Sequence, residues 1–144
     1  MNKRGLSNIV GSLLMILLVL AAAAILFVVI KNFVENSTEK VELDNKCLEI
    51  GLSVINVDSV GENYTVTIER TMSGEDIAGI KFIFENETDS VSRNETGIEL
   101  GEKETYKFIN IGMSNANKIT AVPYFLNKAE KEHYCSKSFS KEII

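Results

Sequence analysis

Residues 9–30 read IVGSLLMILLVLAAAAILFVVI, a run of 22 positions without a charged side chain. As a helix with a rise of about 1.5 Å per residue, this run measures roughly 33 Å, which matches the hydrocarbon thickness of a bilayer. A core helix of a soluble protein keeps one polar face, whereas only Gly11 and Ser12 interrupt the apolar sequence here. The run therefore predicts a membrane-spanning helix, and Lys3 and Arg4 before it favour a cytoplasmic amino end.

Apolar spacing continues past this run, but charged side chains now fill the gaps. Residues 30–41 keep large apolar residues every three or four positions, with lysine and glutamate between them. We therefore expect one helix over residues 6–43, apolar in its first half and amphipathic in its second, that stops at Asp44 and Asn45. Residues 44–144 are then expected to form a head outside the cytoplasm.

Composition restricts what this head can do. The 144 residues include 20 acidic and 15 basic side chains, a formal net charge of -5, so we expect the head to repel nucleic acid phosphates. One histidine, two cysteines and no tryptophan leave few groups for a metal centre or for a nucleophile with its base. A secreted enzyme would also need a convergent polar cluster, and the sequence offers none. We expect no enzymatic activity, no cofactor and no metal.

Two kinds of export signal fit a basic pair before an apolar run. A secretory signal peptide would be cut at small residues such as those at positions 21–23. The apolar run continues through residues 25–30, however, so that cut would leave an apolar free end. A cut in front of the run would retain the whole helix.

The residues KRGLS, followed at once by the long uncharged helix, resemble the class III signal peptide of type IV pilins, in particular archaeal pilins and pilin-like proteins. This resemblance implies that a prepilin peptidase removes residues 1–5 and leaves the apolar helix on the mature protein. The cut falls between Gly5 and Leu6, with Lys3 and Arg4 recognised as part of the leader. Archaellins, the filament subunits of archaeal flagella, share the plan and are the near alternative.

The resemblance also implies partners. Pilins form a homopolymer through the amino-terminal helix, with help from a cytoplasmic assembly ATPase and a membrane platform protein. One position departs from many bacterial pilins, which carry glutamate at the fifth mature position, where this chain has Val10. The likeness therefore implies no registration of subunits by a glutamate.

Small residues in the helix are candidates for close packing against neighbouring helices. Ser7 and Gly11 form a small-xxx-small pair, and a belt of low bulk lies farther along the helix. The alternative is that alanine and glycine are simply frequent in spanning helices. The belt consists of Ala21, Ala22, Ala23 and Ala24.

The head changes to a period of two, which predicts half-buried strands. Their sequences are CLEIGLSV, YTVTIE, IAGIKFIFE, ETYKFINI, KITAVPYFL and EHYCSKSF. We expect an α+β chain whose head is a small all-β, immunoglobulin-like sandwich. Pro123 places its strand at an edge or a bulge, because proline cannot donate to the ladder. Residues 86–97 are expected to form a loop.

Cys47 opens the first predicted strand and Cys135 lies in the last. Outside the cytoplasm a disulfide between them is permitted, and it would tie the beginning of the head to its end. The alternative is a pair of buried free thiols. His133, near Cys135, is interpreted as an ordinary strand residue, because one histidine does not complete a set of metal ligands.

Four Asn-x-Ser/Thr sequons follow the predicted span, and each licenses N-glycosylation where it is exposed. Two of them fall in the expected loop. The four asparagines are Asn36, Asn63, Asn86 and Asn94.

These observations favour a structural subunit of a surface filament, held in the cytoplasmic membrane before assembly and extracellular afterwards. The alternative is a membrane-anchored binding module that keeps an uncut span as a tether for an immunoglobulin-like head. The residues Arg4, Gly5 and Leu6 favour the first reading, because a simple anchor needs no glycine at that place.

Overall fold

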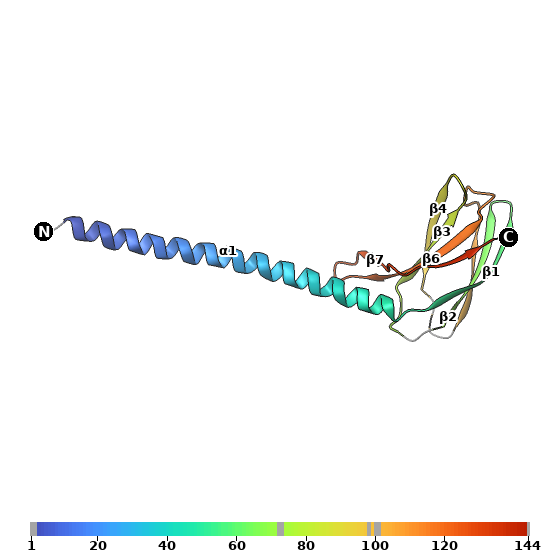
Figure 1. Ribbon diagram of the computed structural model, residues 1–144, viewed down its shortest axis with the longest axis horizontal. Coiled ribbons are helices and arrows are strands. Elements are labelled where there is room, and N and C mark those ends of the chain that lie inside the picture. Colours follow the sequence, from blue (N-terminus) through green and yellow to red (C-terminus); the bar gives the residue numbers. More distant parts are fainter. Residues whose placement is uncertain (1–2, 72–73, 98, 100–101, 144) are drawn as a thin grey trace. The chain divides into compact units, whose positions relative to one another are not determined.

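The computed structural model describes residues 3–71, 74–97, 99 and 102–143, with side chains from Asn8 onward. Contacts between Cα atoms divide the chain into two units, Met1–Lys40 and Val41–Ile144. The fold is α+β, as predicted: one helix, α1 (Lys3–Leu48), precedes antiparallel sheets (Figure 1). Within the described residues the first unit consists of helix alone, and the last turns of α1 belong to the second unit.

The helix was predicted to end at Leu43, before Asp44 and Asn45, but it ends five positions later, at Leu48. Its last turns pack into the second unit, which contains the head. Leu43 is 7% exposed and Cys47 is 4% exposed, one turn apart on the same side of α1. Burial of these two side chains outweighs the weak local preference of Asp44 and Asn45 for a helix stop. Cys47 consequently lies in α1, and the first strand begins only at Leu52.

The head contains two sheets, and all of their described pairings are antiparallel. The smaller sheet has the order β1-β2-β5, formed by β1 (Leu52–Val60), β2 (Asn63–Arg70) and β5 (Lys103–Phe108). The larger sheet has the order β4-β3-β6-β7, with β8 also paired to β6. It is formed by β3 (Gly79–Glu85), β4 (Ser90–Thr96), β6 (Lys118–Leu126), β7 (Glu132–Tyr134) and β8 (Phe139–Glu142).

This order keeps the two-sheet plan of an immunoglobulin-like sandwich, with the fourth strand in the other sheet and an additional strand, β8, paired to β6. In the constant-type domain the fourth strand joins the sheet of the first two strands. Here β4 pairs along its whole length with β3, in the other sheet.

Aromatic side chains from both sheets meet in the core of the head. The ring of Phe108 in β5 lies 5.0 Å from each of the rings of Phe82 and Phe84 in β3. Tyr64 in β2 lies 5.1 Å from Phe84. These tilted and edge-on pairs are the arrangements that aromatic quadrupoles favour, and they hold the two sheets face to face.

The expected loop at residues 86–97 is wrong over most of its length, because residues 90–96 form β4. β4 is an edge strand whose side chains are mostly polar and exposed, and only Val91 packs against the core. Main-chain pairing to β3 holds β4 in place, so its side chains need no apolar alternation. The sequence pattern therefore carried no strand signal here.

β6 lies inside the larger sheet, so the prediction that Pro123 marks an edge strand is wrong, and Pro123 lies instead opposite an interruption of the neighbouring strand. β6 has β3 on one side and both β7 and β8 on the other. β7 pairs with residues 124–126 and β8 with residues 118–121, so Pro123 lies where neither strand pairs. Its carbonyl accepts a hydrogen bond from the Cys135 N–H (3.0 Å). The N–H that proline lacks would point to this same side, away from β3.

Candidate functional site

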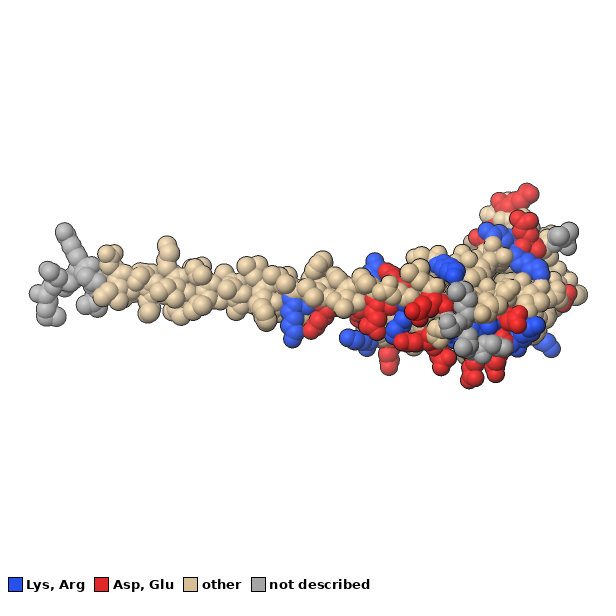
Figure 2. Space-filling view, turned by 60° about the horizontal axis from the view of Figure 1, so that its bottom comes forward, with Lys and Arg blue, Asp and Glu red and all other residues tan. Residues whose placement is uncertain are grey.

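The apolar part of α1 is the first candidate site. Every large hydrophobic side chain from Ile9 to Ile30 is between 49% and 73% exposed in the chain. From Asn8 onward the helix is long and apolar enough to cross a membrane. In Figure 2 this part of α1 shows no acidic or basic side chain. A surface of this size needs a membrane or another apolar partner around it.

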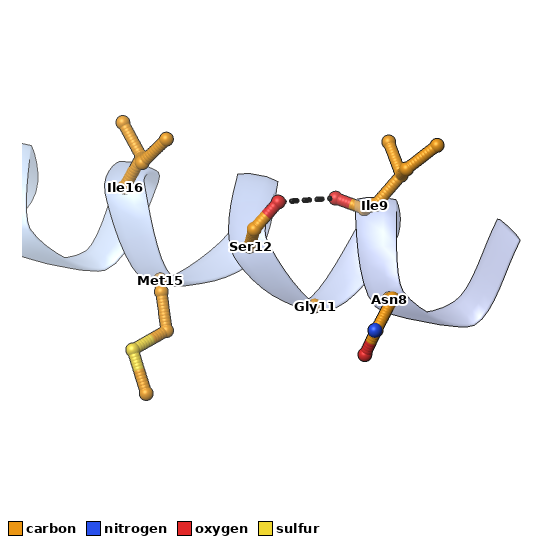
Figure 3. Close-up of a pocket in the computed structure, with 6 residues that line it drawn as sticks. All are labelled: Asn8, Ile9, Gly11, Ser12, Met15 and Ile16. Atoms are coloured by element: carbon orange, nitrogen blue, oxygen red, sulfur yellow. Dashed lines mark hydrogen bonds between the residues drawn. The ribbon is translucent and has the colours of Figure 1, made fainter. Parts of the chain in front are cut away.

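Gly11 opens a shallow groove on this helix (Figure 3). A Cβ atom built at Gly11 meets nothing within 4 Å, so none of the side chains described from Asn8 onward blocks the approach of another helix there. The neighbouring Ser12 hydroxyl donates to the Ile9 carbonyl (3.0 Å) and is satisfied inside the helix, as an apolar environment requires. The groove is lined by Asn8, Ile9, Gly11, Ser12, Met15 and Ile16.

The other predicted packing residues are placed as follows. The alanines at 21–24 all lie exposed on α1. The side chain of Ser7 lies outside the described residues, so the small-xxx-small pair with Gly11 stays a prediction.

The predicted leader overlaps the beginning of α1. The backbone of Lys3, Arg4, Gly5 and Leu6 is helical, while their side chains, and all of Met1 and Asn2, lie outside the described residues. The first four N–H groups of a helix have no acceptor within the helix. The N–H groups of Gly5 and Leu6 are among these four, so the Gly5–Leu6 peptide bond lies in the first described turn of α1.

The end of α1 and the end of the head are joined by the predicted disulfide between Cys47 and Cys135. Their Cα atoms are 5.4 Å apart and 88 positions apart in sequence. Near the disulfide, Asp44 Oδ1 and His133 Nε2 are 2.8 Å apart. His133, in β7, therefore contacts the carboxylate of Asp44, in α1. In the part of the chain that the structure describes, no group of three or more His, Cys, Asp and Glu side chains could hold a metal ion.

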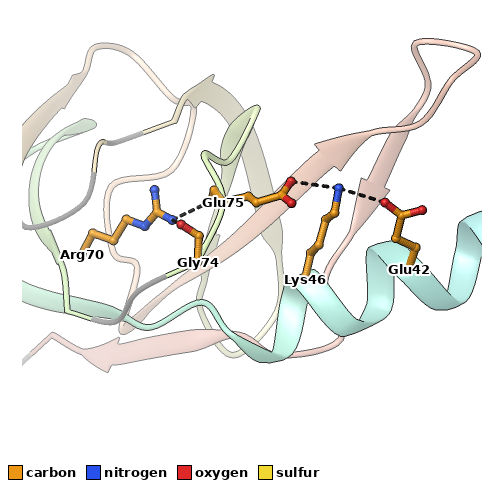
Figure 4. Close-up of polar contacts among 5 residues, drawn as sticks. All are labelled: Glu42, Lys46, Arg70, Gly74 and Glu75. Carbon is orange, nitrogen blue, oxygen red and sulfur yellow. Dashed lines mark hydrogen bonds and ion pairs between the residues drawn. The ribbon is translucent and has the colours of Figure 1, made fainter.

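A second link between α1 and the head is an ion-pair cluster (Figure 4). Lys46 Nζ lies 2.8 Å from Glu75 Oε2 and 3.2 Å from Glu42 Oε1. The hydrogen bonds to Glu75 and then to Glu42 raise the pKa of Lys46 above its usual value. Lys46 therefore keeps its charge, and this link, to a higher pH than a free lysine would.

Arg70 holds the segment that carries Glu75, a role that the sequence analysis missed. Its side chain is buried, and Nη2 donates to the carbonyls of Gly74 (3.0 Å) and Glu75 (2.5 Å), while Nη1 lies 3.6 Å from Asp76 Oδ1. A signal for this burial was present, because the alternation of Tyr64, Val66 and Ile68 along β2 continues to Arg70.

The four sequons occupy different structures. Asn36 lies exposed on α1, Asn63 begins β2, and Asn94 lies in β4. Asn86 lies in the turn between β3 and β4. The predicted loop thus holds one sequon in a turn and one in a strand.

No protein-family model matches this chain, and no curated protein is similar to it in sequence. The functional conclusion therefore depends on the residues and geometry described above.

Removal of the disulfide should destabilise the head. Closing a loop of this length lowers the entropy of the unfolded chain by an amount worth about 4–5 kcal/mol in the chain-entropy model. Urea unfolding of the full-length Cys47→Ser/Cys135→Ser protein in detergent should show that its free energy of unfolding is lower than that of the original protein by an amount of this order. As a control, a reductant should destabilise the original protein by a similar amount and leave the double variant unchanged. Equal stability of both proteins without reductant would show that the bond contributes nothing.

Proposed function

We propose that this chain is a structural subunit of an archaeal type IV pilus-like surface filament. The observation that supports this most is a helix with no charge from Ile9 to Ile30 and every large side chain exposed, directly behind Lys3, Arg4 and Gly5. A basic pair and a glycine at this place suit a leader that is cut in front of the helix, so that the helix remains on the mature protein.

The retained helix explains why such a subunit would polymerise. Each large apolar side chain costs about 1.5–3 kcal/mol when it is exposed to water, so the helix can leave the membrane only into another apolar environment. Helices of identical subunits provide that environment, and the groove at Gly11 and the alanines at 21–24 allow close approach.

The remaining steps follow from the resemblance to pilins. A prepilin peptidase removes residues 1–5 while the precursor lies in the cytoplasmic membrane. A cytoplasmic ATPase, acting through a membrane platform protein, supplies the work that lifts each subunit into the filament. The acidic head, closed by its disulfide, then faces outward and is open to glycosylation.

The structure of the head supports a second candidate function. Two-sheet β-sandwiches serve as domains of many cell-surface proteins. A membrane-anchored binding module would keep residues 1–5, span the membrane once and not polymerise.

Mass spectrometry of the native protein distinguishes the candidates. A filament subunit should begin at Leu6, with a mass lower than that of the full chain by residues 1–5. An amino end at Met1 would favour the anchored module, and an amino end at Ala24 would show a secretory signal peptide and contradict both.

A further inference from the structure

The tripeptide Asn-Glu-Thr occurs twice in the head, at residues 86–88 and 94–96. Both copies meet the sequence requirement for N-glycosylation. The first copy lies in the turn after β3, whereas the second lies within β4. Because the three residues are identical, the folded head provides a direct comparison of how structure affects one acceptor sequence.

The first copy forms a compact turn around the Asn86 side chain. Asn86 Oδ1 accepts hydrogen bonds from the backbone N–H groups of Thr88 (2.9 Å) and Asp89 (2.7 Å) and from the Thr88 hydroxyl (3.2 Å). All three bonds use Oδ1 and none uses Nδ2, the atom to which a sugar is attached. Asn86 itself is half-buried and residues 87–89 are exposed, so the turn reaches the surface with Thr88 beside the asparagine.

The second copy has its acceptor nitrogen in use. Asn94 Nδ2 donates to Glu132 Oε1 (3.0 Å) and to the Tyr134 hydroxyl (3.1 Å), so both of its hydrogens are engaged. The Tyr134 hydroxyl in turn donates to the other carboxylate oxygen of Glu132.

The surroundings hold this arrangement in place. The Tyr134 ring lies 5.3 Å from the ring of Tyr124 and 5.0 Å from Lys81 Nζ. Asn94 itself is paired with Lys81 of β3. Asn94 is exposed, but a transferase could use its Nδ2 only after both hydrogen bonds had broken.

The two remaining sequons lack the turn found at Asn86. The Thr38 hydroxyl, which belongs to the Asn36 sequon, donates to the Val34 carbonyl of the helix (2.8 Å). Two helix positions differ by about 200°, so Asn36 and Thr38 point to nearly opposite sides of α1. Asn63 begins an extended strand, and its Oδ1 accepts the Asn110 N–H (2.9 Å) rather than a group of its own sequon.

We propose that Asn86 is the N-glycosylated asparagine of the head, and that Asn94 stays unmodified because the transferase meets a folded head. This proposal rests on the extracytoplasmic location in the proposed function. The donor is a sugar carried on a lipid phosphate. Nδ2 of Asn86 forms a bond to the anomeric carbon of the sugar, the bond from that carbon to the phosphate oxygen breaks, the lipid phosphate leaves, and Nδ2 loses one proton.

Tryptic peptides of the native protein separate the two copies, because Arg93 lies between them. Residues 82–93 should carry a glycan mass, and residues 94–103 should have the unmodified mass. A glycan on Asn94 would overturn the proposal, whether it is found on its own peptide or on an uncut peptide spanning residues 82–103. An unmodified Asn86 in a protein whose cysteines are joined would also overturn it.

Matched substitutions provide the control. Thr88→Ala and Thr96→Ala each remove the threonine of one copy by the same chemical change. The first should abolish the glycan mass of the head and the second should leave it unchanged, and the reverse result would contradict the proposal. A failure of the proposed function would give a different result. A head in the cytoplasm would lack every glycan, and its Cys47 and Cys135 would react with an alkylating reagent without prior reduction.

Discussion

Replacement of Val19 by arginine should abolish filaments and lower the amount of protein in the membrane. Val19 lies at the middle of the charge-free run from Ile9 to Ile30, and its side chain is 64% exposed in the single chain. An arginine at the centre of a spanning helix costs about 2.5–3.5 kcal/mol on insertion scales, which is roughly a hundredfold in an equilibrium constant. The same charge would also lie unpaired between the packed helices of a filament.

Val60→Arg is the matched control for this variant. Val60 lies at the end of β1 in the head and is 77% exposed, so the same substitution adds the same charge to an exposed valine outside the helix. Electron microscopy should show filaments for Val60→Arg and none for Val19→Arg, with the membrane level of each protein measured in parallel. Normal filaments from Val19→Arg would show that α1 is not the filament core.

Replacement of Gly5 by phenylalanine should leave an uncut precursor in the membrane and no filaments. The side chain would be added directly at the peptide bond that the prepilin peptidase is proposed to cut. An uncut chain keeps Lys3 and Arg4 in front of the span, and two charges cannot enter an apolar filament core without partners. The measurements are the amino-terminal residue by mass spectrometry and the filament count by electron microscopy.

Gly11→Ala is the control for Gly5→Phe. It shows whether the loss of any glycine from α1, rather than of Gly5 in particular, prevents cleavage. A Cβ atom at Gly11 meets nothing within 4 Å of the single chain, so this variant should fold, insert and be cut like the original. If filaments of Gly11→Ala are also lost although cleavage is normal, Gly11 is a packing residue of the assembled helices. Filaments of normal abundance from Gly5→Phe would contradict the proposed processing.

The apolar helix could be predicted from the sequence because its signal lies in consecutive positions. Hydropathy and helix length need no knowledge of the neighbours of a residue, so the helix predicted over residues 6–43 is found within a few residues of those bounds. The strands with alternating apolar residues could also be predicted, since each buries one face against the opposite sheet, although the last predicted strand is divided and Cys135 lies between β7 and β8 rather than in a strand. Cysteine pairing followed from the small number of cysteines and the expected compartment.

Other features depended on segments far apart in the chain. β4 could not be predicted because its neighbour β3 holds it through the main chain, which leaves no pattern in its side chains. Pro123 is tolerated inside a sheet because β7 and β8 pair on either side of it. The helix runs on to Leu48 because Leu43 and Cys47 are buried by the head.

The sequence by itself determined that the chain carries a helix fit for a membrane, a β-rich head, two cysteines to close it and four sequons. Only the tertiary structure decided that two copies of one tripeptide differ, with Asn86 bonded through Oδ1 inside its own turn and Asn94 bonded through Nδ2 to Glu132 and Tyr134 across the sheet. The physical reason is that hydropathy and periodicity are properties of neighbouring residues, whereas the availability of a single nitrogen atom depends on which distant side chains the fold brings within hydrogen-bond distance of it.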